Sequence, residues 1–89
     1  MLNIEIQGHT DNQGDEILLQ QLSEDRAESI KNYLVYEKHI HPLRIEAIGY
    51  GSKYPTNKNK TEEERKKNRR VEIMISKVKK QTGNMAKKF

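Results

Sequence analysis

Three short stretches in which apolar and polar residues alternate place the tightest limit on how this chain can fold. They span residues 2–7, 43–48 and 70–78, and each sets most of its apolar side chains on one face of an extended strand, with Ile48 and Met74 on the other face. Only 33% of the 89 residues are hydrophobic, so one thin core has to serve all three strands. The pattern predicts one small domain built on a sheet.

Helical periodicity fills the first gap between these strands. Apolar residues recur three to five positions apart between residues 15 and 37, at Leu22, Ala27, Ile30 and Leu34. We expect a short helical turn followed by a main helix with one apolar face. Ser23 is the expected N-cap of that main helix, which would put Arg26 in its first turn.

The second gap contains a helix-start signal. Thr61 and Glu64 have the spacing of a capping box, in which each side chain satisfies a free backbone donor of the other residue. A short helix ending near residue 67 or 68 follows from it. The order β-α-β-α-β predicts an α+β fold: a two-layer sandwich with the helices packed on one face of a small mixed sheet. We assign residues 1–78 to this domain and residues 79–89 to a basic, disordered tail.

Charge and composition limit the partners and the chemistry. The net charge of +4 favours acidic partners, among them nucleic acid, anionic lipid and the carboxylate-rich peptides of the cell wall. The absence of cysteine excludes disulfides and thiolate metal sites. No run approaches the roughly 18 apolar residues that a membrane-spanning helix needs. No cofactor is predicted, and no nucleophile with a partnering base suggests an enzyme.

Asp11 and Arg26 are the most informative charged pair. Asp11 follows the first predicted strand, and Arg26 lies on the helix that comes next. The loop at a strand's carboxyl end and the start of the following helix lie close together in open α/β sheets, where ligands usually bind. A carboxylate and a guanidinium facing one pocket suit a zwitterion, with ammonium at Asp11 and carboxylate at Arg26. A mutual salt bridge with no ligand is the equally open alternative.

Four separated motifs, in order, resemble the OmpA-like peptidoglycan-binding domains of outer-membrane proteins, Pal lipoproteins and MotB stator proteins. The motifs are Gly8-His9-Thr10-Asp11-Asn12-x-Gly14, Leu22-Ser23-x-x-Arg26-Ala27, Gly49-Tyr50-Gly51 with Pro55, and Asn59-x-Thr61 followed by Arg65 and Asn68-Arg69-Arg70-Val71-Glu72-Ile73. Together they run from about residue 4 to residue 75. The resemblance implies a periplasmic domain, associated with the outer membrane, that anchors its protein to the cell wall.

The resemblance also supplies a ligand and a set of site residues. It implies that Asp11 and Arg26 grip the free amino and carboxylate groups of diaminopimelate in the peptidoglycan stem peptide. By the same analogy, further residues line or shape the pocket: Thr10, Asn12, Leu22, Asn68 and Arg70. The other two arginines of the last motif, Arg65 and Arg69, are expected to contact acidic groups of the wall or to hold the short helix.

The chain departs from the family pattern in three respects. Leu19 stands where the family usually has asparagine, and Glu64 stands where it usually has glycine. The resemblance begins at the second strand of the family fold, so we expect an N-terminally truncated member of the family. Such a domain would expose apolar residues and an unpaired strand edge.

Two other classes of function compete with this hypothesis. The basic run Lys66-Lys67 with Arg69-Arg70 would neutralise phosphates in a nucleic-acid-binding module, although aromatic stacking residues are sparse. The exposed edge would recruit a partner by strand addition in a protein-interaction module. A metal site is not predicted, because His9, His39 and His41 have no acidic residues spaced with them.

Overall fold

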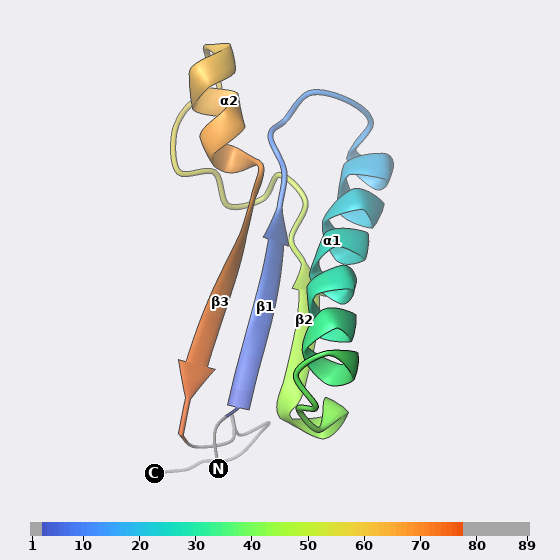
Figure 1. Cartoon of the computed structure of the whole chain (residues 1–89). Helices are drawn as coiled ribbons and strands as arrows, with labels where there is room; N and C mark the ends of the chain where they lie inside the picture. The colour runs from blue at the N-terminus through green and yellow to red at the C-terminus, as the bar shows by residue number, and fades with distance from the viewer. Residues whose placement is uncertain (1–2, 78–89) are drawn as a thin grey trace, which may run out of the picture.

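The computed structural model describes residues 3–77, and β1 is the central strand of its sheet (Figure 1). The elements follow the order β1 (Asn3–His9), α1 (Glu16–Tyr36), the 3-10 turn η1 (Pro42–Arg44), β2 (Ile45–Gly49), α2 (Glu62–Asn68) and β3 (Arg70–Ser76). β2 pairs with β1 in parallel and β3 pairs with it antiparallel. The predicted α+β fold with a small mixed sheet is confirmed. The tail predicted at 79–89 lies outside the described residues.

α1 is one continuous helix, so the prediction of a separate helical turn before it was wrong. Its N-cap is Asp15, whose carboxylate accepts hydrogen bonds from the backbone N–H groups of Ile17 and Leu18. Ser23 lies inside the helix and is fully buried, which rules out the capping role predicted for it. Arg26 is accordingly about three turns into the helix and not in its first turn.

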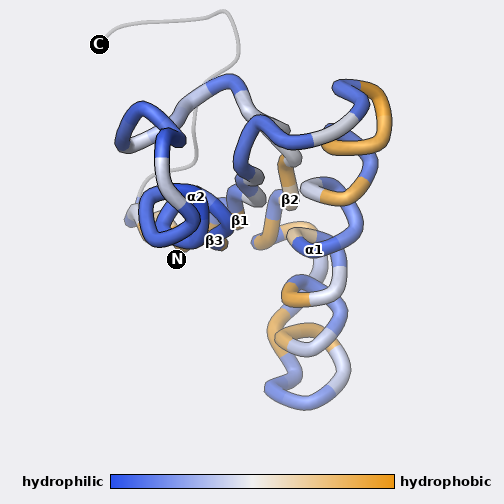
Figure 2. The backbone as a smooth tube through the Cα atoms, turned by 90° about the horizontal axis from the view of Figure 1, so that it is seen from above, coloured by the Kyte–Doolittle hydropathy of each residue, from blue (hydrophilic) through white to orange (hydrophobic). Residues whose placement is uncertain are grey.

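The core lies where α1 covers β1 and β2. Ile6 and Ala27 are 0% exposed, and Ile45 of β2 completes the buried cluster. The helix approaches so closely because two glycines lie opposite it. A Cβ atom on Gly8 would lie 2.1 Å from the backbone oxygen of Ser23, and one on Gly49 would lie 2.4 Å from the backbone nitrogen of Glu24. Figures 1 and 2 show α1 beside β1 and β2.

β3 receives much less cover than the other strands. The register places Ile73 beside Ile6 and Ile75 beside Ile4, on the face that α1 covers at β1 and β2. Ile73 is nevertheless 50% exposed and Ile75 62% exposed, because the helix does not extend across β3. The sheet therefore has an apolar strip along one outer strand that no described element covers.

α2 lies beyond the end of the sheet at which β1 finishes and β3 begins (Figures 1 and 2). The predicted capping box is present: Thr61 accepts from the Glu64 N–H, and the Glu64 carboxylate accepts from the Thr61 N–H. These bonds fix the start of a helix too short to be stable by itself. The helix ends at Asn68, one residue short of β3, so it positions the two arginines that follow.

Candidate ligand-binding site

Asp11 lies just past the end of β1, in a loop that is bonded to the segment after β2. The Thr10 N–H donates to the Gly51 carbonyl at 2.9 Å, and the Thr10 hydroxyl donates to the Asp11 carbonyl at 2.8 Å. Asp11 is only 6% exposed. Its carboxylate oxygen Oδ1 accepts from the Gln13 N–H at 3.0 Å. The sequence thus builds a tight turn that presents one carboxylate at the sheet end.

Arg69 is the ion-pair partner of Asp11, a pairing that was not predicted from the sequence. Its Nη1 donates to Oδ2 of Asp11 at 2.6 Å, while its Nη2 contacts Glu62 on α2. Burial alone would raise the pKa of Asp11, but the Gln13 N–H, the Arg69 guanidinium and the charge of Arg65 hold that pKa below its ordinary value. Asp11 is therefore ionised at neutral pH.

Arg26 makes no hydrogen bond or ion pair within residues 3–77, so the direct Asp11–Arg26 salt bridge does not form. The residue is half-buried, and it lies beside the buried side of α1, which Ser23 and Ala27 form as a stripe along the helix. Gln20, on the other flank of that stripe, donates to the Gly49 carbonyl of β2 at 2.6 Å. Helical geometry therefore puts Arg26 on the flank nearer β1 and β3. It shares that flank with Leu22, which is 40% exposed.

Asn68 is the last residue of α2, and its side chain reaches back to the loop that leads into that helix. It is 0% exposed, and its amide oxygen accepts from the backbone N–H and the hydroxyl of Thr56. Its amide nitrogen donates to the side chains of Asn57 at 2.9 Å and Asn59 at 2.7 Å. These contacts use both lone pairs and both N–H groups. In this structure Asn68 shapes the loop and has no polar group free for a ligand.

Arg70 belongs to the other face of the sheet. Successive strand residues alternate between faces, so Arg70 lies opposite the side that Val71 presents to α1. Its guanidinium bonds the Glu72 carboxylate and the backbone carbonyls of Asn68 and Tyr54. The structure therefore separates Arg70 from Asp11.

Asn12 is exposed in the loop after Asp11 and accepts only from the Gln13 side chain.

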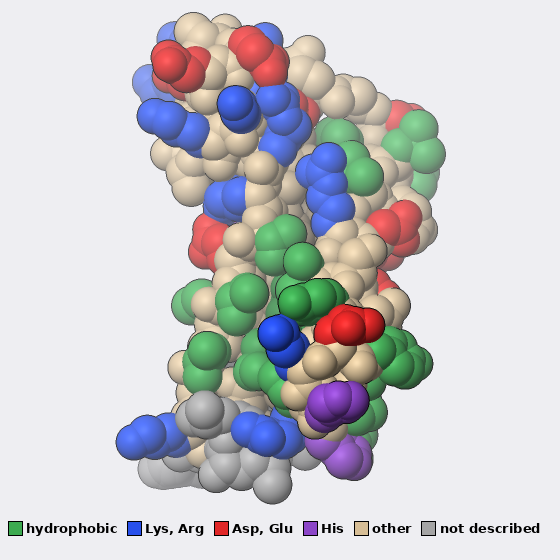
Figure 3. Space-filling view, viewed as in Figure 1, with side chains coloured by type: hydrophobic (Ala, Val, Ile, Leu, Met, Phe, Trp, Pro, Cys, Tyr) green, Lys and Arg blue, Asp and Glu red, His purple; other side chains and the backbone are tan. Residues whose placement is uncertain are grey.

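The basic run around α2 is less free than its sequence suggests. Figure 3 shows lysine and arginine side chains mixed with acidic ones at this end of the molecule. Arg69 is paired with Asp11 and Glu62, and Arg70 with Glu72, on the other face of the sheet. Lys66 and Lys67 are exposed. A continuous phosphate-binding surface would need those arginine charges uncompensated.

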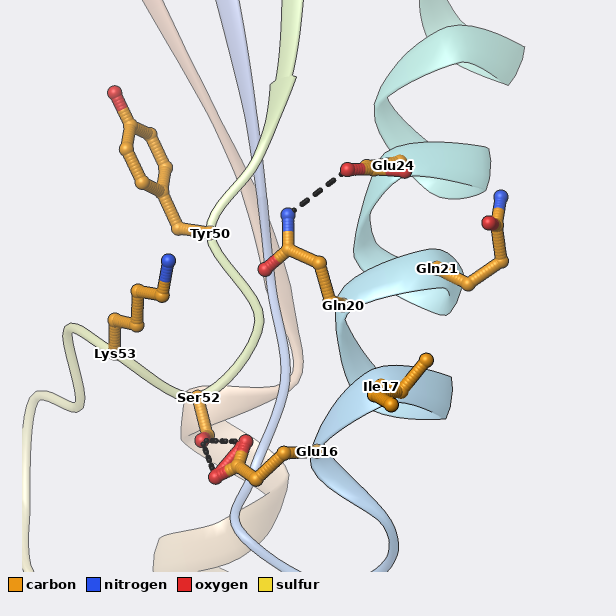
Figure 4. Close-up of a pocket in the computed structure, with 8 residues that line it drawn as sticks. All are labelled: Glu16, Ile17, Gln20, Gln21, Glu24, Tyr50, Ser52 and Lys53. Carbon is orange, nitrogen blue, oxygen red and sulfur yellow. Dashed lines mark hydrogen bonds between the residues drawn. The ribbon is translucent and has the colours of Figure 1, made fainter.

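A separate hollow of about 470 Å³ opens between the first half of α1 and the segment after β2 (Figure 4). Its polar groups largely satisfy one another. The Ser52 hydroxyl donates to the Glu16 carboxylate at 2.9 Å, and Gln20 donates to Glu24 at 3.0 Å. The charged side chains that line this hollow are exposed, whereas the Asp11 carboxylate is nearly buried.

Within residues 3–77, no group of three or more histidine, cysteine, aspartate or glutamate side chains is placed to hold a metal ion. None of the helices there combines the length and the apolar character needed to cross a membrane.

The sequence matches the model of the OmpA family over residues 1–69, and the chain belongs to that family. It is 44% identical to outer membrane porin F of Pseudomonas fluorescens over 73 residues, covering 82% of this chain and 22% of that protein. It is 52% identical to outer membrane protein A of Bordetella avium over 68 residues, covering 76% of this chain and 34% of that protein. The chain thus spans about a third or less of these relatives.

Solved structures show the same fold. The peptidoglycan-associated lipoprotein from Burkholderia pseudomallei superposes with a TM-score of 0.79 at 27% identity, over 84% of this chain and 63% of that one. The C-terminal domain of Helicobacter pylori MotB superposes with a TM-score of 0.78 at 29% identity, over 88% of this chain and 60% of that one. The predicted family and architecture are confirmed.

Proposed function

We propose that this chain binds peptidoglycan without forming a covalent bond and so anchors an outer-membrane or periplasmic protein to the cell wall. The OmpA family match and the likeness to a peptidoglycan-associated lipoprotein support this class of function. We further propose that the ligand group is the diaminopimelate of the stem peptide, held between Asp11 and Arg26. This second proposal depends on the charges of the site.

The ionised, nearly buried carboxylate of Asp11 is the observation that carries the proposal. A carboxylate offers about four lone-pair positions, and Gln13 and Arg69 use one each. An ammonium group therefore has a place to donate without displacing Arg69. Arg69 is also paired with Glu62, so one positive charge is shared between two carboxylates. The negative charge of Asp11 is therefore only partly compensated and can still attract a cationic ligand group.

The spacing of the two charges supports a ligand between them. Ser23 of α1 lies against Gly8 of β1, and α1 runs back along β1 in the opposite direction (Figure 1). Asp11 is three residues beyond Gly8 and Arg26 three residues beyond Ser23, so their Cα atoms lie roughly 14 Å apart along the sheet. That separation suits a small doubly charged group better than direct side-chain contact.

The site suits binding and not catalysis. The described contacts of the Asp11 carboxylate are a backbone N–H and an arginine, and arginine cannot act as a general base because it stays protonated. The nearby Thr10 hydroxyl is already donated to the Asp11 carbonyl. Each charge-assisted contact would contribute about 1.5 to 3 kcal/mol, which gives a single site a micromolar to millimolar Kd. Many copies on one polymer would then provide firm anchoring.

Calorimetric titration with soluble stem peptides tests the proposal. A diaminopimelate tetrapeptide should bind, and a lysine tetrapeptide, which lacks the second carboxylate, should bind at least about tenfold more weakly because one charge-assisted contact is lost. Asp11→Asn and Arg26→Gln should each weaken diaminopimelate binding to a similar degree.

Matched substitutions separate the site from general charge. Asp25→Asn changes an exposed carboxylate on α1, and Lys31→Gln changes a cation on the other flank of the same helix. Both should bind like the unmodified chain. Equal affinity of all four variants for both peptides would refute the roles of Asp11 and Arg26. Absence of binding to whole sacculi as well would refute wall anchoring.

A further inference from the structure

A second hollow opens on the face of the sheet opposite α1. Its volume is about 280 Å³, and its walls are Gln7, His9, Tyr50, Tyr54, Arg70 and Glu72. None of these residues except Arg70 belongs to the site predicted from the sequence. Each wall residue on β1 and β3 lies at a register position that points away from α1.

The hollow and the Asp11 site share the same end of the sheet. Asp11 lies two residues beyond His9, Arg69 directly precedes Arg70, and Tyr50 follows Gly49 at the end of β2. A backbone bond from the Tyr50 N–H to the Gly8 carbonyl, 2.9 Å long, continues the pairing of β1 and β2 up to this point. The two sites therefore lie back to back, built by neighbouring residues of the same strands.

Aromatic rings form a corner on one side of this hollow. The His9 ring stacks on Tyr50 with centroids 5.5 Å apart, and Tyr54 meets Tyr50 nearly at right angles with centroids 5.2 Å apart. His9, which stacks on Tyr50, is 2% exposed, whereas Tyr54 is 59% exposed. Burial lowers the pKa of His9, with the positive charge of Arg70 adding to the effect, so its ring is uncharged at neutral pH.

Polar groups of balanced charge form the other side. The Arg70 guanidinium is paired with Glu72 and also bonds two backbone carbonyls, and this pairing lowers the pKa of Glu72. Gln7 contributes an amide whose nitrogen donates to Glu5 at 2.6 Å. The charges of Arg70 and Glu72 cancel, so the hollow offers little attraction to phosphate, to a free carboxylate or to an ammonium group.

From this combination we infer that the hollow is a sugar-binding subsite for the glycan strand of the same wall polymer. A pyranose has a face of C–H groups that packs on an aromatic ring and a rim of hydroxyls that bond planar polar side chains. Tyr54 supplies the exposed ring, while Gln7 and Glu72 supply amide and carboxylate groups at the rim. Only the identity of the sugar, an amino sugar of the wall glycan, rests on the proposed function.

Titration with chitotetraose, a neutral oligomer of N-acetylglucosamine, followed by amide NMR shifts, tests the subsite. The full chain should show saturable shifts centred on Gln7, Tyr50 and Glu72. Tyr54→Ala should weaken binding about tenfold, whereas Tyr54→Phe, which keeps the ring, should bind nearly as well as the unmodified chain. Tyr36→Ala removes a similarly exposed tyrosine on α1 and should leave the titration unchanged.

The result can be separated from that of the stem-peptide titration. Sugar binding that survives Asp11→Asn supports the subsite, whatever the stem peptide does. Stem-peptide binding without any chitotetraose shift, or chitotetraose shifts that Tyr54→Ala leaves intact, would overturn the subsite and leave the Asp11 proposal standing. Shifts of the same residues with adenosine but not with the sugar would show that the hollow accepts flat aromatic rings, and would also overturn it.

Discussion

Arg69 donates from Nη1 to the Asp11 carboxylate at 2.6 Å and so joins two residues that are 58 positions apart in the sequence. The second branch of the same guanidinium reaches Glu62, so one arginine connects the β1 loop, α2 and the start of β3. Asp11 has little contact with water, so this pairing, together with the Gln13 N–H, compensates its charge. Arg69 thereby fixes both the place and the charge of the candidate ligand-binding carboxylate.

The first prediction concerns the pH dependence of stability. The pKa of Asp11 is lower in the folded chain than its ordinary value, so the folded state favours the ionised form. That contribution should be complete above the ordinary carboxyl pKa of about 4 and should be lost as the pH falls below it, toward the folded pKa. Asp11→Asn should therefore lower the free energy of unfolding by about 1 to 3 kcal/mol at pH 7, and by less at pH 3.

Urea denaturation followed by circular dichroism at several pH values measures this difference. Asp25→Asn is the control, because Asp25 is exposed on α1 and accepts only from the Gln21 side chain among its described contacts. Its effect should be small and nearly independent of pH. A cost of Asp11→Asn that stayed constant from pH 7 to pH 3 would contradict the assigned charge state.

The second prediction concerns Asn68, whose buried amide holds three loop residues. Asn68→Ala would leave the Thr56 N–H and hydroxyl and the Asn59 side-chain oxygen without these partners, and would remove one of two donors to the Asn57 side-chain oxygen. Unsatisfied buried groups are costly, so we expect a loss of about 2 to 4 kcal/mol in the free energy of unfolding. Asn12→Ala, in an exposed loop, should cost less than about 0.5 kcal/mol. Equal effects of the two substitutions in chemical denaturation would count against this role.

The parts of the fold that depend on local patterns could be predicted from the sequence. Alternation of apolar residues indicated all three strands, and the Thr61 capping box indicated α2, because both signals act within a few residues. The single helix α1 was not predicted, since Ser23 resembles an N-cap when it is considered alone. The burial of Ser23 depends on Gly8 and Gly49, two paired strand residues that let the backbone of α1 approach the sheet closely. Paired glycines beside a small helical residue are a usable signal of such contact.

The candidate site was predictable only in part. The sequence motif singled out Asp11, which the structure places at the sheet end in a nearly buried position. The partnership with Arg69 was missed because it depends on how α2 is placed relative to the β1 loop. The alternation of β3, extended back by one residue, was a further signal: it assigns Arg69 and Arg70 to opposite faces, and only one of them can meet Asp11.

The third prediction tests the close approach of α1 to the sheet. Gly8→Ala would bring a methyl group to 2.1 Å from a backbone oxygen of Ser23, which cannot move without shifting the helix. Overpacking of this kind should cost about 2 to 3 kcal/mol of unfolding free energy. Gly14→Ala provides the contrast, because its Cβ would meet only Leu19 at 3.8 Å and the cost would come from its φ of +125°. A cost of about 1 kcal/mol is expected there.

The fourth prediction concerns the exposed strip on β3. Ile6 is 0% exposed and Ile73, its partner across the strand pair, is 50% exposed. Ile6→Ala should therefore cost about 2 to 5 kcal/mol of unfolding free energy, whereas Ile73→Ala should cost less than about 1 kcal/mol. Thermal or urea denaturation of the two variants measures both values.

The same strip should govern self-association. β3 is an outer strand of the sheet, and within residues 3–77 no second strand pairs with its other edge. Exposed apolar edges attract further strands, so we expect sedimentation velocity to show association that increases with protein concentration. Ile73→Lys should reduce it, because a buried ammonium at a strand contact would lose its water. Gln21→Lys, at an exposed position on α1, adds the same single positive charge away from the strip. An equal reduction by both would mean that net charge, and not the apolar strip, controls association.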